Sequence, residues 1–285
     1  MIKDITIGQF FPGNSLVHRL DPRMKLVVTF IYIIVIFLCK NFLALGAMVL
    51  FLLISVLLSK ISLKLIGKSI KPVFIIVLIT SVLQIIYNDK GIALIEYGKF
   101  HITTGGVFTA LFTTVRIVSL VVASSLLTYT TSPTLLTDAI ERLFSPLKIV
   151  GINVHSIAMM MTIALRFIPT LIDEVDKIMS AQKSRGADLE NGNLVQRGKA
   201  LIPIFVPLFI NSFSRAYELA FAMECRCYKG GEGRTRLKEM KLALKDYVAI
   251  ILLISVSVFV VITNKLIVAP EEYSNILDSF VRFVL

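Results

Sequence analysis

The chain is poor in the residues from which disulfide frameworks and metal sites are built. It has three cysteines and three histidines among its 285 residues. Cys39, Cys225 and Cys227 give no disulfide framework. The Cys225-x-Cys227 spacing lacks the second cysteine pair or nearby histidine pair that a zinc site needs. We therefore predict no metal site, and we interpret both cysteines as small neighbours of Arg226.

Motifs for catalysis and nucleotide binding are also missing. His18, His101 and His155 are far apart, and none belongs to a His-Glu-x-x-His zinc pattern. No Gly-x-Ser-x-Gly nucleophile motif occurs. Gly67-Lys68-Ser69 is similar to the end of a phosphate-binding loop, but Ser62 stands where the first glycine of that loop is required. We predict neither an enzyme nor a chain that binds a cofactor of its own.

Charge is scarce as well, and long apolar runs take its place. Only 17% of the residues are charged, whereas 56% are hydrophobic. A soluble domain of this length needs more polar surface. Most of the uncharged runs are near the roughly 20 residues that a helix needs to cross a bilayer. We predict five spans, at Leu26 to Cys39, Asn41 to Ser59, Pro72 to Asn88, Ile117 to Thr137 and Tyr247 to Asn264.

The basic residues of the connecting segments predict how the chain is oriented. Residues 60–71 contain four lysines and no acid, whereas residues 89–105 contain charges of both signs. Because cytoplasmic loops are enriched in Lys and Arg, we expect residues 60–71 and the N-terminus in the cytoplasm. Lys25 and Lys40, which flank the first run, are expected to reach the lipid headgroups. The chain is thus predicted to be a multi-pass cell-membrane protein that contacts lipid and no nucleic acid.

Four smaller features have a structural role in our interpretation. Arg116 needs a partner or water, and the fourth helix either starts near Gly105 or starts later. A hairpin is expected within residues 91–104, and an amphipathic external helix in the tail at residues 271–285. The acidic cluster Asp173-Glu174-Asp176 is interpreted as a solvated face or as salt bridges to other subunits rather than as a cation site.

Residues 132–246 combine charges of both signs with apolar stripes at helical spacing. Ser132 followed by Pro133 predicts the start of a short amphipathic helix. Two long stretches follow, each predicted to form a helix with one apolar seam, and the two seams can pack on each other. The seams are Ile157, Met161, Ala164, Ile168, Leu171, Val175 and Ile178, and Ile202, Val206, Phe209, Phe213, Ala216, Ala220 and Met223. We divide the chain into a bundle of four transmembrane helices (1–131), this cytoplasmic or interfacial region, and a last transmembrane helix with its tail (247–285).

An alternative assigns two further ordinary spans to the long stretches. The first stretch would form a helix of about 50 Å, longer than the hydrocarbon layer, so we do not interpret it as a perpendicular span. The alternative places spans at Ile157 to Ile172 and Leu201 to Phe213, which gives seven in total. It would place Arg166 and Arg215 inside lipid.

Both long stretches end in an arginine between small residues, Ser184-Arg185-Gly186 and Cys225-Arg226-Cys227. An arginine in a last helical turn faces the negative end of the helix dipole, and Gly186 or the Gly230-Gly231 pair can end the helix. A planar guanidinium on a rigid helix suits bidentate bonds to a carboxylate of a partner protein. One such arginine would be a solvated helix end, but two indicate a pair of docking sites.

With these residues the chain resembles the transmembrane (T) component of energy-coupling factor transporters, importers of the ATP-binding-cassette class. The resemblance covers nearly the whole chain. It rests on four segments: His18-Arg19-Leu20-Asp21-Pro22-Arg23-Met24-Lys25, Ala164-Leu165-Arg166-Phe167-Ile168-Pro169, Ala181-Gln182-Lys183-Ser184-Arg185-Gly186 and Ala222-Met223-Glu224-Cys225-Arg226-Cys227-Tyr228. Ser184 is a mild departure from the family's Ala-Arg-Gly motif, and Cys225 and Cys227 are larger ones.

The resemblance implies two cytoplasmic coupling helices whose arginines dock into two ABC-type ATPase subunits. Arg166, Pro169, Ala181, Gln182, Glu224 and Tyr228 would support these motifs. ATP and Mg would be bound by the ATPases, and a separate membrane subunit would bind a vitamin or another micronutrient. One alternative is a T component dedicated to a single cobalt, nickel or biotin importer. Another is a stand-alone polytopic channel or membrane enzyme, for which the sequence offers no catalytic cluster.

Overall fold

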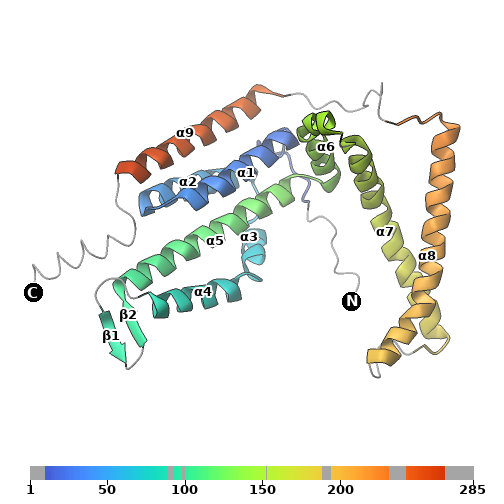
Figure 1. Cartoon of the computed structure of the whole chain (residues 1–285), viewed down its shortest axis with the longest axis horizontal. Coiled ribbons are helices and arrows are strands. Elements are labelled where there is room, and N and C mark those ends of the chain that lie inside the picture. The colour runs from blue at the N-terminus through green and yellow to red at the C-terminus, as the bar shows by residue number, and fades with distance from the viewer. Residues whose placement is uncertain are drawn as a thin grey trace, which may run out of the picture. The chain divides into compact units, whose positions relative to one another are not determined.

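The structure, a computed structural model, describes residues 10–88, 93–97, 100–151, 153–187, 194–230 and 242–266. These residues are mainly helical (Figure 1). The elements are α1 (Pro22–Leu38), α2 (Phe42–Ser59), α3 (Leu63–Ile70), α4 (Phe74–Tyr87), β1 (Ala93–Tyr97), β2 (Phe100–Thr103), α5 (Thr104–Thr130), α6 (Pro133–Leu143), the 3-10 helix η2 (Ser145–Val150), α7 (Val154–Ser184), α8 (Leu194–Cys225) and α9 (Leu244–Leu266). The predicted helical membrane class is confirmed. The tail at residues 271–285 lies outside the described residues.

Strands β1 and β2 form the hairpin that was expected within residues 91–104. They pair antiparallel, with Glu96 opposite His101 and Tyr97 opposite Phe100. Thr103 then begins α5, since its hydroxyl accepts the N–H of Gly106 and donates to the carbonyl of Asn88. The hairpin therefore joins the end of α4 to the start of α5.

Helix α5 corrects the predicted fourth span. It begins at Thr104 and ends at Thr130, whereas the prediction placed the span at Ile117 to Thr137. The cap at Thr103 starts the helix early, and the extended conformation of Thr131 (φ −134°, ψ 126°) ends it before Pro133 opens α6. The sequence left open whether this helix starts near Gly105 or later, and the structure shows that its polar and glycine-rich first turns are helical.

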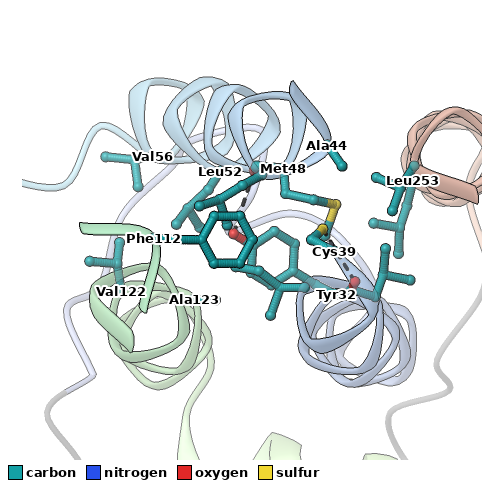
Figure 2. Close-up of a cluster of buried hydrophobic side chains, with 14 residues drawn as sticks. Tyr32, Cys39, Ala44, Met48, Leu52, Val56, Phe112, Val122, Ala123 and Leu253 are labelled. Atoms are coloured by element: carbon teal, nitrogen blue, oxygen red, sulfur yellow. Dashed lines mark hydrogen bonds between the residues drawn. The ribbon is translucent and has the colours of Figure 1, made fainter. Parts of the chain in front are cut away.

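The chain folds as two compact units. The described part of the membrane unit lies within residues 9–132 and 240–285, and the described part of the helix-pair unit lies within residues 133–239. In the membrane unit, α1, α2, α5 and α9 surround one apolar core. Figure 2 shows its labelled side chains pointing from these helices into a common interior, with Tyr32 of α1 donating a hydrogen bond to the carbonyl of Met48 in α2.

Helix α9 is attached to the membrane unit by polar groups at both of its ends. At its start, Asp246 is buried and accepts the backbone N–H of Asp21 at 2.8 Å. At its end, Asn264 donates to the carbonyl of Leu38 at 2.8 Å, and Asn41 donates to the carbonyl of Thr263 at 2.9 Å. These bonds fix the position of α9 along α1, although the two helices are far apart in the sequence.

Five described helices are long and apolar enough to cross a membrane, namely α2, α5, α7, α8 and α9. The bent pair α3 and α4, with an angle of 58° between its helices, would add a sixth. This set differs from the predicted one, because α1 has only 17 residues and α7 and α8 now qualify. By length and composition, α7 and α8 therefore agree with the alternative that places additional spans there.

Candidate docking ends of the long helix pair

Helices α7 and α8 have 31 and 32 residues. The side chain of Asn153 caps the start of α7 by accepting the N–H of Ser156. Each helix contains internal proline, Pro169 in α7 and Pro203 and Pro207 in α8, and both helices continue past these positions. The two predicted long helices are thus present, each as one continuous element.

The two helices run antiparallel, as their side-chain contacts show. Gln182 near the end of α7 reaches the carbonyl of Pro203 near the start of α8. Glu174 faces Asn211, and Tyr228, just past the end of α8, donates to the sulfur of Met159 near the start of α7. Arg185 and Arg226 therefore lie at opposite ends of the pair, and Figure 1 shows α7 and α8 as neighbours running in opposite directions.

A polar contact lies at the middle of the helix pair. Oε1 of Glu174 accepts the amide of Asn211 at 2.6 Å, and Oε2 forms a 2.8 Å ion pair with Arg215. The acidic cluster was expected to be solvated or to bind other subunits, but Glu174 binds within this chain. Arg215 consequently has a counter-ion. The seven-span alternative would therefore not place Arg215 in lipid as an unpaired charge. Arg166 is exposed.

The two arginine ends have the same backbone geometry. At the end of α7, the N–H groups of Gly186 and Ala187 bond to the carbonyls of Lys183 and Gln182. At the end of α8, the N–H groups of Cys227 and Tyr228 bond to the carbonyls of Glu224 and Met223 in the same pattern. This is a Schellman-type helix end, in which the residue after the arginine is left-handed.

Cys227 therefore occupies at the second end the place that Gly186 occupies at the first. Gly186 has φ 85° and Cys227 has φ 55°. The left-handed region is easily reached by glycine but costs a residue with a Cβ about 1 kcal/mol. The Gly230-Gly231 pair was a predicted end of this helix, but the helix ends earlier, at Cys225, and Cys227 is the left-handed residue that follows it. The same backbone turn is thus unstrained at Gly186 and strained at Cys227.

All six residues of the two arginine ends are exposed. Neither guanidinium forms an ion pair with another residue in the described part of the chain, whereas the Ser184 hydroxyl bonds back to the carbonyl of Ser180. Four of the six supporting residues make contacts that explain their place in the motifs. Gln182 and Tyr228 connect the two helices, and the carbonyls of Ala181 and Glu224 accept bonds from the helix ends. Pro169 is exposed within α7.

The predicted packing of two apolar seams is wrong for α8. Its seam residues Ile202, Val206 and Phe213 are exposed, and Phe209 stacks between Phe205 and Phe213 along the open face. The face of α8 that meets α7 instead carries Asn211 and Arg215. The seam of α7 divides, since Ile168, Leu171, Val175 and Ile178 are half-buried whereas Ile157, Met161 and Ala164 are exposed. Helical periodicity located the apolar faces but could not show what covers them.

Sequence reasoning missed a polar cluster at one end of the membrane unit. Lys25 was expected to reach the lipid headgroups, but it is buried, and its ammonium donates to the carbonyls of His18 and Thr130 and to the hydroxyl of Thr131. Asp21, one helical turn before Lys25, donates its backbone N–H to the carboxylate of Asp246. The cluster thus holds together the first turn of α1, the end of α5 and the start of α9, where the chain leaves the membrane unit. The sequence prediction did not find this cluster, because the partners of Asp21 and Lys25 are distant in the sequence.

Arg116 has the structural role that was favoured for it. Its guanidinium donates to the carbonyl of Cys39 at 2.6 Å and lies over the ring of Phe112, 4.7 Å from the centroid. Arg116 thereby provides a hydrogen-bond donor for the carbonyl that follows the last residue of α1. The helix starts near Gly105, as one of the two possibilities held.

The architecture defines a class: a multi-helix membrane protein that carries a long antiparallel helix pair with an exposed arginine at each end. A family model described as "Cobalt transport protein" matches residues 13–237. Proteins described as "Energy-coupling factor transporter transmembrane protein EcfT" are similar over most of the chain. The one from Clostridium kluyveri is 54% identical over 250 residues, 87% of this chain and 93% of the relative.

Two further relatives carry the same description. The protein of Ruminiclostridium cellulolyticum is 50% identical over 246 residues, covering 86% of this chain and 92% of the relative. That of Bacillus subtilis is 43% identical over 254 residues, covering 89% of this chain and 96% of the relative. The chain belongs to the family of energy-coupling factor transporter transmembrane proteins, and it is a transport component of the membrane.

Proposed function

We propose that the chain couples two cytoplasmic ABC-type ATPase subunits to a substrate-binding membrane subunit that imports a vitamin or another micronutrient. Arg185 and Arg226 each dock on one ATPase. ATP and Mg are bound by those subunits, and the helix pair transmits their movement. The observation that carries this proposal is the matched geometry of the two ends, which presents two exposed arginines from equivalent Schellman-type turns.

The antiparallel arrangement separates this proposal from the seven-span alternative. If α7 and α8 crossed the membrane as ordinary spans, Arg185 and Arg226 would lie on opposite sides of it. Only one arginine could then meet a cytoplasmic ATPase. Docking of both requires the helix pair to lie on the cytoplasmic side, along the membrane rather than through it.

Thiol labelling tests this arrangement. Cys225 and Cys227 are exposed and report the end of α8. A Ser184→Cys variant in which Cys225 and Cys227 are changed to Ser reports the end of α7, and Cys39 is buried in both proteins. We expect a membrane-impermeant maleimide to label neither end in intact cells and to label both ends after the membrane is opened. Labelling of one end alone in intact cells would support the seven-span alternative.

Copurification tests the docking itself. We expect two ATPase subunits to copurify with the native chain and to be lost, together with substrate uptake, when Arg185 and Arg226 are both changed to Ala. The matched control is Lys177→Ala with Lys199→Ala, which removes two exposed charges from the same helices. Unchanged assembly and uptake in the arginine variant would contradict the proposal.

The same preparation shows whether this chain works with several substrate-binding subunits or is dedicated to one. The matching family model carries the description of a cobalt transport protein, which would fit a chain dedicated to one metal importer. The relatives described above carry the general description of energy-coupling factor transporters. We expect several different substrate-binding membrane subunits to copurify, and recovery of one alone would favour a dedicated importer.

A further inference from the structure

The membrane unit contains a cavity of about 400 Å³ where four of its helices begin or end. The walls come from the segment before α1, the first turns of α1 and α9, and the last turns of α2 and α5. Each of the four helices contributes side chains to the lining, for example Met24, Phe51, Leu126 and Val248. Binding sites for small molecules usually have about 300–1,000 Å³, so the volume is sufficient for a ligand.

The lining is apolar except for a few hydroxyl groups and two lysines, Lys25 and Lys245. The ammonium group of Lys25 is already bound by the carbonyls of His18 and Thr130 and by the Thr131 hydroxyl. Lys245 is exposed. The neighbouring carboxylate of Asp246 is turned away, onto the N–H groups of Asp21 and Ala243, so no acid lines the cavity.

We propose that this cavity binds an anionic phospholipid, with an acyl chain in the apolar interior and the phosphate at Lys245. The cavity lies at one end of a transmembrane bundle, where headgroups meet acyl chains. The arrangement of an apolar interior with one available ammonium group matches the two parts of such a lipid. If residues 60–71 and the N-terminus are cytoplasmic, the lipid belongs to the leaflet in which anionic lipids are concentrated.

The size of the cavity favours an acyl chain over a protein segment. An α-helix with its side chains is about 10 Å wide and rises about 5.4 Å per turn, so one turn would fill the whole volume. An extended hydrocarbon chain is much thinner and can follow the cavity along α9, from Leu244 to Leu252. The proposal does not depend on docking of ATPases, and it can be tested on the full-length chain alone.

The test counts the lipids that remain bound to the chain. The full-length protein is extracted in a mild detergent and equilibrated with equal amounts of phosphatidylglycerol and phosphatidylcholine, and retained lipids are identified by native mass spectrometry. We expect one phosphatidylglycerol per chain, with a preference of about fivefold over phosphatidylcholine, the effect of one lysine near a membrane surface. Lys245→Ala should abolish the preference, whereas Lys265→Ala, at the opposite end of the same helix, should preserve it.

Two substitutions that fill the cavity test the acyl site. Ala249→Phe from α9 and Ser55→Phe from α2 should each abolish retention of the lipid, and Val258→Phe, on an exposed face of α9, should not. Retention that is equal in both filled variants and the native chain would overturn the proposal. So would equal retention of the two lipids by the native chain. A photoreactive group at position 249 that labels a protein rather than lipid in native membranes would assign the cavity to a partner subunit instead.

Discussion

In the membrane unit, 14 buried apolar side chains form one core, 13 of them from α1, α2, α5 and α9 and one from Cys39 just past the end of α1. In the described part of the helix-pair unit, the buried apolar side chains are only Ala139, Ala158 and Ile204. The first unit also uses buried polar groups to fix its helix ends, whereas the second exposes phenylalanines along α8 and an arginine at each end. A region with this much uncovered apolar surface requires another surface to cover it, either lipid or a partner protein.

The comparison separates two sources of stability. The membrane unit derives its structure from contacts within the chain, so single substitutions in its interior should be costly. The helix pair depends on its own hydrogen bonds, on one central polar contact and on whatever covers its faces. Substitutions there should change stability little and should alter assembly instead. Three experiments test this difference, from the largest expected effect to the smallest.

Asp246→Ala should destabilise the membrane unit by about 3 kcal/mol, because it leaves two backbone N–H groups of the buried cluster without an acceptor. Those groups belong to Asp21 and Ala243. The measurement is thermal unfolding in detergent, with Asp173→Ala on the exposed surface of α7 as the control. If both variants unfold at the same temperature, the buried cluster is not what holds α9 in place.

The Glu174–Arg215 pair should contribute about 1 kcal/mol, a smaller effect because solvent screens a partly exposed ion pair. The Arg215 side chain is 40% exposed and that of Glu174 is 14% exposed. A double-mutant cycle with Glu174→Ala and Arg215→Ala measures this coupling through the unfolding of the helix pair. The cycle of Glu174→Ala with Lys199→Ala should give no coupling, and a coupling of the same size there would refute the assignment of the energy to this contact.

Cys227→Gly should stabilise the end of α8 by about 0.5–1 kcal/mol, since glycine adopts the left-handed conformation without strain. Gly186→Ala should weaken the end of α7 by about 1 kcal/mol for the same reason. Amide hydrogen exchange in the last turn of each helix measures both effects, with Cys225→Ala as the control. Slower exchange in Cys227→Gly is expected, and faster exchange would mean that the cysteine makes contacts that offset its strain.

Local signals in the sequence predicted much of the fold and of the site. Apolar runs located the helices of the membrane unit, and the small residues beside Arg185 and Arg226 marked two helix ends that prove to be equivalent. What the sequence could not supply were contacts between distant segments. The partner of Lys25 is a carbonyl at Thr130, and the partner of Asp246 is a backbone N–H at Asp21. Neither backbone group has a sequence signature.

The remaining errors have physical causes of the same kind. The first turns of α5 contain Thr104, Gly105 and Gly106, which disfavour helix in isolation, but the cap at Thr103 and the packing of the membrane unit override that preference. The apolar seam of α8 was predicted to pack against α7, because periodicity identifies an apolar face without showing what that face contacts. The antiparallel course of α7 and α8, on which the docking argument depends, became visible only through their cross-contacts.

The contact between Glu174 and Arg215 lies at the same distance from the two arginine ends, because Glu174 precedes Arg185 and Arg215 precedes Arg226 by 11 residues each. If the two helices pivot about this contact, each segment from the contact to its arginine is about 16 Å long. A change of about 10° in the angle between the helices would then move each arginine by about 3 Å relative to the other helix. Under the proposed function, two ATPases that approach each other would thus change the angle at this contact without touching it.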